Sequence, residues 1–141
     1  ETTGMVVAPR EAAPLQPRKV IAWTHGTWGI ADECAPSSDR RFFELTPAID
    51  AVRRGYVVVA PDYPGLGSAG AHPYLVGPAT ARATLDAVKA ARSIAGAYAG
   101  TRFAVWGESQ GGHAALWTGQ SMRSGGAGLT LVGVAAAAPP T

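Results

Sequence analysis

A serine between glycines is the residue of this sequence with the clearest potential for chemistry. Gly107-Glu108-Ser109-Gln110-Gly111 matches the pattern G-x-S-x-G, and it lies directly between an apolar, strand-like run and a helical pattern. A sharp strand-to-helix turn of this kind presents a serine hydroxyl as a nucleophile at the positive end of a helix. The backbone N–H of Gln110 would then donate to an oxyanion. The alternative is an ordinary turn in which Ser109 caps the helix.

A second turn with chemical potential follows an apolar run at residues 20–24. His25-Gly26-Thr27 comes directly after this run. In a hydrolase with a G-x-S-x-G turn, a second oxyanion donor comes from a loop after an earlier strand. Gly26 allows close backbone approach, and the N–H of Thr27 or of Gly26 would point at the carbonyl oxygen. The alternative is that His25-Gly26 merely ends a strand.

A third polar turn, residues 62–67, follows the apolar run at 56–60 and is expected at the same edge of the sheet as Ser109. Asp62 and the Pro64-Gly65 pair favour local turn chemistry over a direct catalytic role. Around this edge, four side chains are candidates for lining a substrate pocket: His25, Tyr63, Leu66 and Glu108.

A catalytic base and acid are not evident in the sequence. A serine nucleophile needs a histidine within hydrogen-bond reach and an acid behind it. His25 and His72 precede Ser109, whereas the expected chain order is Ser, acid, His. His113 lies four residues after the serine on the same helix, and no Asp or Glu follows Ser109 at all. We therefore interpret all three histidines as structural.

Apolar runs alternate with helical patterns along the chain. An unbroken run such as residues 56–60 is typical of a parallel strand that is buried on both faces. The order of the elements predicts an α/β fold, a mostly parallel sheet with helices on both faces. Strands are expected at 4–8, 19–24, 56–60, 102–106 and 131–135, and helices at 40–54 (starting near Thr46, with Pro47 at its first position), 79–99 and 110–123.

Composition excludes several classes of protein. The chain has 141 residues and a net charge of +2, from 12 Lys and Arg against 10 Asp and Glu, with basic residues at most in pairs. No basic stripe follows, so a nucleic-acid partner is not expected. A single cysteine excludes an internal disulfide framework, and three scattered histidines lack zinc-ligand spacing. The expected chemistry needs no metal or organic cofactor. No apolar stretch reaches the length of a membrane span, and no signal peptide is evident at the start.

Several motifs, taken together and in order, resemble the secretory lipase family of α/β-hydrolases. The resemblance runs from about Thr3 to Pro140, is strongest to the bacterial branch, and is more distant to the yeast lipase A type. It is carried by residues 20–27 (VIAWTHGT), 34–37 (CAPS), 55–67 (GYVVVAPDYPGLG), 72–75 (HPYL) and 107–113 (GESQGGH).

The resemblance implies a secreted lipase or esterase that acts on acyl esters, including acylglycerols, with contact to a lipid interface. Ser109 would be the nucleophile, Gln110 one oxyanion donor, and Thr27 or Gly26 the other. Members of the family are longer, so residues 1–141 would be the N-terminal core portion of a partial α/β-hydrolase fold. The cap, the last strands, and the triad acid and histidine would lie outside this chain, which alone would be inactive unless a second polypeptide supplied them. Cys34 would pair with a cysteine of the missing cap region.

Two other functions stay open at this point. A serine peptidase or an acyltransferase would use the same turn, since the preference for peptide or ester depends on the cap and the pocket. A non-catalytic α/β subunit that needs a partner chain would keep the fold without the reaction.

Overall fold

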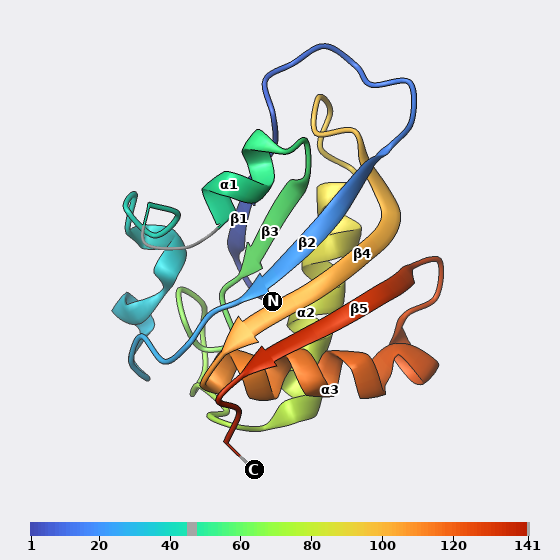
Figure 1. Cartoon of the computed structure of the whole chain (residues 1–141). Helices are drawn as coiled ribbons and strands as arrows, with labels where there is room; N and C mark the ends of the chain where they lie inside the picture. The colour runs from blue at the N-terminus through green and yellow to red at the C-terminus, as the bar shows by residue number, and fades with distance from the viewer. Residues whose placement is uncertain (45–47, 141) are drawn as a thin grey trace.

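A computed structural model describes residues 1–44 and 48–140. Its centre is a five-stranded sheet in the order β1-β3-β2-β4-β5 (Figure 1). The strands β2 to β5 are mutually parallel where they pair, so the prediction of a mostly parallel sheet is confirmed. The strands are β1 (Gly4–Val7), β2 (Arg18–Thr24), β3 (Val57–Pro61), β4 (Ala99–Glu108) and β5 (Thr130–Ala137).

The first strand runs against the others. β1 pairs with β3 in the antiparallel sense, with Val7 opposite Val58. The end of β1 therefore lies near the end of the sheet at which β2 begins. A loop at residues 8–17 arches over that end and joins the two strands (Figure 1). Because the chain returns at the same end, no crossover helix is needed here.

Helices cover both faces of the sheet. The helices α2 (Gly77–Ala91) and α3 (Gln110–Gly125) pack together on one face, and α1 (Ala48–Arg53) lies on the other (Figure 1). Two short 3₁₀ turns, η1 (Asp32–Cys34) and η2 (Pro36–Ser38), precede α1. The parallel strands thus run between covered layers, which explains their unbroken apolar sequences.

The strand β3 shows how the core is divided. All five of its residues are buried, and successive side chains point to opposite faces. Val57 and Val59 pack in a cluster with Leu85 of α2, whereas Val58 packs in a cluster with Phe42 on the other side. One strand therefore holds together both halves of the hydrophobic core.

Two predicted helices differ from the structure. The helix predicted at 79–99 ends at Ala91, because Gly96 (φ +86°) and Tyr98 (φ +52°) turn the chain back into β4. Within the stretch predicted as helix at 40–54, residues 40–44 form turns and α1 is helical. Its expected start at Thr46 and Pro47 lies outside the described residues. Its predicted end is confirmed, since Gly55 follows with φ +89°.

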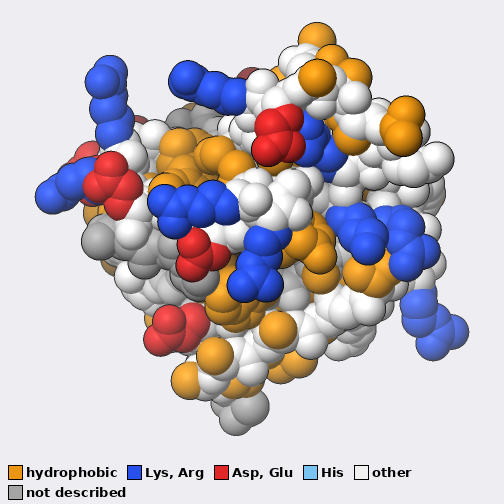
Figure 2. Space-filling view, turned by 45° about the horizontal axis from the view of Figure 1, so that its top comes forward, with side chains coloured by type: hydrophobic (Ala, Val, Ile, Leu, Met, Phe, Trp, Pro, Cys, Tyr) orange, Lys and Arg blue, Asp and Glu red, His pale blue; other side chains and the backbone are white. Residues whose placement is uncertain are grey.

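The surface mixes charge types. Lys and Arg side chains project at separate points of the face shown in Figure 2, with acidic and apolar groups between them. At the sheet edge, Val132 and Val134 of β5 are exposed. In the described part of the chain, no helix has both the length and the apolar character needed to cross a membrane.

Candidate active site

Ser109 occupies a strained turn between β4 and α3. Its backbone has φ +55° and ψ −124°, a conformation that costs free energy for any residue with a Cβ. The turn is tied at both ends: the Ser109 N–H donates to the Ala137 carbonyl at 2.9 Å, and its carbonyl accepts from the His113 N–H at 3.1 Å. The side chain of Ser109 is left exposed at the carboxyl edge of the sheet.

Two glycines let the end of β2 pack against the first turn of α3. A Cβ at Gly107 would overlap the Thr24 hydroxyl, and a Cβ at Gly111 would overlap the Thr24 carbonyl. The Thr24 hydroxyl donates to the Gly111 carbonyl at 2.8 Å. This contact brings the residues that follow Thr24 beside the serine. It also explains why the glycines of the G-x-S-x-G pattern are needed here.

The two predicted sources of oxyanion donors lie close to the same serine. A Cβ at Gly26 would lie 3.9 Å from the Ser109 Cβ and 3.4 Å from the Glu108 carbonyl, which are ordinary contacts. The space at Gly26 therefore does not itself require glycine. Thr27 is exposed next to it. Gln110 is the first residue of α3, where helix geometry leaves the backbone N–H without an intrahelical acceptor.

A pocket of about 380 Å³ opens beside Ser109. Two of the four predicted pocket residues, His25 and Glu108, line it. The other two, Tyr63 and Leu66, are fully buried in a separate cluster. Three aromatic side chains that the sequence analysis did not single out complete much of the wall: Trp23, Trp28 and Phe42. The two tryptophans flank the 25–27 turn in sequence, so the sequence could have indicated that they line the pocket. Phe42 comes from a turn distant in sequence, so no local pattern indicated its place in the pocket.

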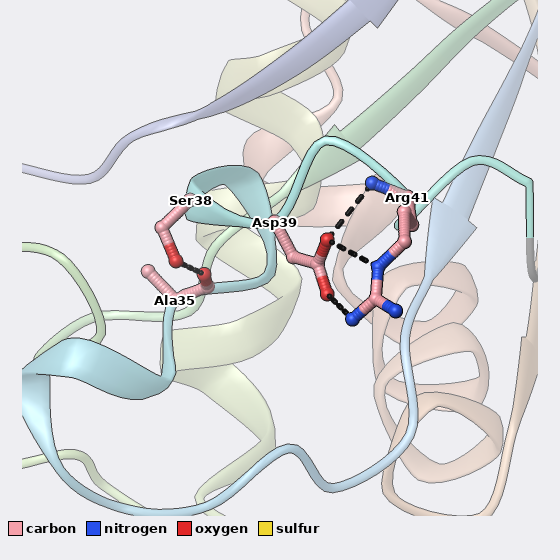
Figure 3. Close-up of polar contacts among 4 residues, drawn as sticks. All are labelled: Ala35, Ser38, Asp39 and Arg41. Atoms are coloured by element: carbon pink, nitrogen blue, oxygen red, sulfur yellow. Dashed lines mark hydrogen bonds and ion pairs between the residues drawn. The ribbon is translucent and has the colours of Figure 1, made fainter.

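The turn that delivers Phe42 is held by short polar contacts (Figure 3). The Asp39 carboxylate accepts from the Arg41 N–H at 2.9 Å and from its guanidinium at 3.3 Å, and the Ser38 hydroxyl donates to the Ala35 carbonyl at 2.7 Å. The bond from the Arg41 N–H lowers the pKa of Asp39. The Phe42 N–H donates to the Asp39 carbonyl at 3.0 Å. A side chain distant in sequence is thus fixed at the pocket wall.

His25 is enclosed beneath the pocket. Its side chain stacks on Tyr63 with ring centroids 4.2 Å apart, and its Nδ1–H donates to the Gly26 carbonyl at 2.6 Å. Its Nε2 is buried and has no hydrogen-bond partner among the described residues. Burial lowers the pKa of His25 to about 4. The imidazole is therefore neutral at pH 7, and among the described residues no hydrogen bond joins it to Ser109.

The other two histidines are also engaged or enclosed. His72 Nδ1–H donates to the Pro64 carbonyl at 2.9 Å, and its Nε2 lies 2.9 Å from the Gln110 amide nitrogen. His113 Nδ1 is buried and unpartnered within the described chain. Across residues 1–44 and 48–140, no histidine is hydrogen-bonded to the Ser109 hydroxyl.

Asp62 differs from its expected role in a local turn. Its carboxylate accepts from the Thr3 hydroxyl at 2.6 Å and from the Ser37 N–H at 3.0 Å. Both donors are distant in sequence, so Asp62 joins the chain start and η2 to the end of β3. The turn itself is present, with Gly65 at φ +78°.

Cys34 is a half-buried free thiol. It packs against Gly29, where an added Cβ would overlap its sulfur. The described residues contain no cluster of three His, Cys, Asp or Glu side chains that could hold a metal ion.

Comparison with known proteins assigns the family. A sequence model of the family described as secretory lipase matches residues 42–141. The chain belongs to the secretory lipase family. Lipase 2 of Candida albicans is 32% identical over 116 residues, which are 72% of this chain and 24% of that protein. Lipase 1 of the same yeast is 27% identical and is covered to 26%. This secretory lipase chain thus spans about a quarter of the curated relatives it matches.

Solved structures place the fold among α/β-hydrolases. The rice cell wall degrading esterase LipA of Xanthomonas oryzae is 30% identical with a TM-score of 0.71, over 93% of this chain and 36% of that chain. Candida antarctica lipase A in its closed state is 26% identical with a TM-score of 0.73, over 93% and 32%. The predicted partial α/β-hydrolase fold is confirmed for this member of the family.

Replacing Gly111 by alanine is expected to destabilise the fold by about 1–3 kcal/mol or more, because the new methyl group overlaps the Thr24 carbonyl. Chemical denaturation of wild type and variant measures the loss. Gly133→Ala is the matched control, since a Cβ there meets nothing within 4 Å. Equal stability of the two variants would contradict the packing described.

The buried neutral His25 makes stability depend on pH. Its pKa is about 4 in the folded state against the ordinary 6.5, so the unfolded chain binds the proton first as pH falls. The free energy of unfolding should therefore drop by about 1.4 kcal/mol per pH unit between about 6.5 and 4 from this group alone. Denaturation curves across this range, for wild type and for His25→Phe, measure the contribution. The same slope in both proteins would argue against it.

Proposed function

We propose that this chain carries the nucleophile and oxyanion donors of a secreted serine carboxylester hydrolase, a lipase or esterase. The observation that carries the proposal is the strained, exposed Ser109 with the 25–27 turn beside it. Strain at a non-glycine residue persists only where surrounding structure enforces it, and it clusters at functional sites. Membership in the secretory lipase family supports both the hydrolase activity and the secretion.

The reaction would proceed through an acyl-enzyme. The Ser109 hydroxyl oxygen attacks the ester carbonyl as its proton passes to a base, and the alcohol leaves as the tetrahedral intermediate collapses. Water then releases the acid and restores the serine. The backbone N–H of Gln110, with that of Thr27 or Gly26, would stabilise the oxyanion of each tetrahedral intermediate. No metal or organic cofactor takes part in these steps.

The base and the acid are proposed to come from residues outside this chain. Among the described residues, no histidine is hydrogen-bonded to the Ser109 hydroxyl, and no acidic residue follows Ser109 in the sequence. Those groups would come from the same protein's further sequence or from a second polypeptide. Cys34, half-buried and free here, would pair with a cysteine of that same region.

The substrate is proposed to be a small acyl ester or an acylglycerol, met at a lipid interface. Beside Ser109, the pocket has an aromatic part, where Trp28 packs edge-on against Phe42 at 5.4 Å, and a polar part that includes Thr27 and Glu108. The aromatic part would contact a hydrocarbon chain, while the polar part lies where the ester group would meet Ser109. A peptide or a nucleic acid finds no charged recognition groups there beyond Glu108.

Replacing Ser109 by alanine in the full-length protein should lower kcat for a short-chain nitrophenyl ester by about 10⁴-fold or more, since the acyl-enzyme cannot form. Ser124→Ala, on the exposed end of the same helix, should leave the rate unchanged. A serine-reactive phosphonate should label the wild type at Ser109. Retained turnover or absent labelling would overturn the assignment, and faster turnover of a matched amide would indicate a peptidase.

Residues 1–141 alone should hydrolyse the same ester no faster than buffer, because they lack a histidine placed to deprotonate Ser109. Circular dichroism would verify that the purified 14.4 kDa chain is folded during the assay. Full activity of this folded species would contradict the proposal that base and acid lie outside it.

A further inference from the structure

A single loop contacts the side chains of both predicted oxyanion residues. The segment 62–76 joins β3 to α2, and it contains His72 and Tyr74, two residues apart. His72 contacts Gln110, and Tyr74 contacts Thr27. We propose that His72 and Tyr74 are positioning residues that hold the two oxyanion donors in place before substrate binds; this rests on the proposed function.

In the hydrogen bond between His72 and Gln110, the donor and the acceptor can be assigned. The Nδ1–H of His72 donates to the Pro64 carbonyl at 2.9 Å, which leaves Nε2 to act as an acceptor. The Gln110 amide nitrogen lies 2.9 Å from this Nε2 and donates to it. Gln110 is only 1% exposed, so its amide relies on protein partners rather than on solvent. The bond therefore anchors the first residue of α3, whose backbone N–H is the predicted donor.

Tyr74 makes the corresponding contact on the other side of the serine. Its hydroxyl lies 3.1 Å from the Thr27 hydroxyl. Both side chains are exposed, so this bond is weaker than the part-buried bond between His72 and Gln110. The bond matters because it holds the 25–27 turn, which contributes the second predicted oxyanion donor. The rings of His72 and Tyr74 also meet edge to face, with centroids 6.0 Å apart. One anchor thus supports the other.

A buried tyrosine backs this arrangement. Tyr63 lies parallel to the His72 ring, with centroids 6.0 Å apart, and also stacks on His25. Its hydroxyl donates to the His25 carbonyl at 2.9 Å, immediately before Gly26. Burial raises the pKa of Tyr63, so the hydroxyl keeps its proton as a donor. The 25–27 turn is therefore held from below by Tyr63 and from the side by Tyr74.

The loop is folded to present these side chains. Gly65 has φ +78°, and a Cβ there would lie 2.5 Å from the His72 N and 2.8 Å from the Gly70 carbonyl. The chain thus folds back tightly on itself between these residues. The Tyr74 N–H donates to the His72 carbonyl at 2.9 Å. Such a compact loop loses little entropy on substrate binding, which favours preorganised donors.

A residue that only positions oxyanion donors should affect the chemical step. The oxyanion exists in the transition state and not in the bound ester, so its stabilisation changes kcat rather than KM. Loss of a whole donor costs about 10²–10³-fold in kcat. A displaced donor retains part of its interaction, and we expect about a tenfold loss for each anchor.

The test compares variants of the full-length protein on a short-chain nitrophenyl ester. His72→Phe keeps the ring stack but removes the acceptor, and it should lower kcat about tenfold with KM nearly unchanged. His72→Gln restores an acceptor near the Nε2 position and should recover much of the loss. Tyr74→Phe should lower kcat severalfold, and each loss should appear equally in inhibition by a boronic acid, whose tetrahedral adduct occupies the oxyanion position.

Tyr98→Phe is the matched control, since Tyr98 is 44% exposed against 45% for Tyr74 and lies before β4, away from the serine. Thermal unfolding would verify each variant, and if His72→Phe does not fold, Tyr74→Phe decides. Unchanged kcat in folded His72→Phe and Tyr74→Phe, a loss confined to KM, or equal loss in His72→Phe and His72→Gln would overturn the proposal. Failure of the proposed function would differ, because the wild type would then lack Ser109-dependent turnover.

Discussion

The contact between the end of β2 and the first turn of α3 is the constraint on which the site depends. Thr24 approaches so closely that only glycine fits at residues 107 and 111, and its hydroxyl bonds the Gly111 carbonyl. Ser109 lies between these two packed glycines, with a positive φ that the surrounding structure must sustain. The same contact carries the 25–27 turn to the serine. The strained turn and its neighbours are therefore held by one packing contact.

The free energy that sustains this strain comes from the layers around the sheet. β3 is buried on both faces and joins the cluster under α2 and α3 to the cluster beside α1. Beneath the serine, the core is also polar: the Tyr63 hydroxyl bonds the His25 carbonyl, and the buried His25 is held neutral. A neutral buried ring costs less desolvation than a charged one would. The site thus rests on a buried base in which His25 and Tyr63 are uncharged.

Much of the fold was predictable because its signals are local. The apolar run of β3, the Gly55 stop of α1 and the turn at Ser109 follow from side-chain burial and backbone freedom over a few residues. The end of α2 was not predictable in this way, because the alanine-rich sequence continues past Ala91. The helix ends where the chain turns back into β4. Asp62 was misjudged for a similar reason: its carboxylate bonds Thr3 and Ser37, which sequence distance hides. Tyr63 and Leu66 were predicted to line the pocket but are fully buried. Their position after a strand does not distinguish a buried side chain from one that lines a pocket.

Local patterns of residues are enough to predict the serine between glycines, the His-Gly-Thr turn, and the alternation of strands and helices that carries them to one edge of a sheet. Which of these segments come into contact depends on the fold. Strand order brings Thr24 to Gly111, the fold of the 62–76 loop brings His72 to Gln110 and Tyr74 to Thr27, and a distant turn delivers Phe42 to the pocket. Hydrogen bonds and packing of this kind act over a few ångströms of space. They are therefore set by how the chain returns on itself, which a local pattern of residues does not encode.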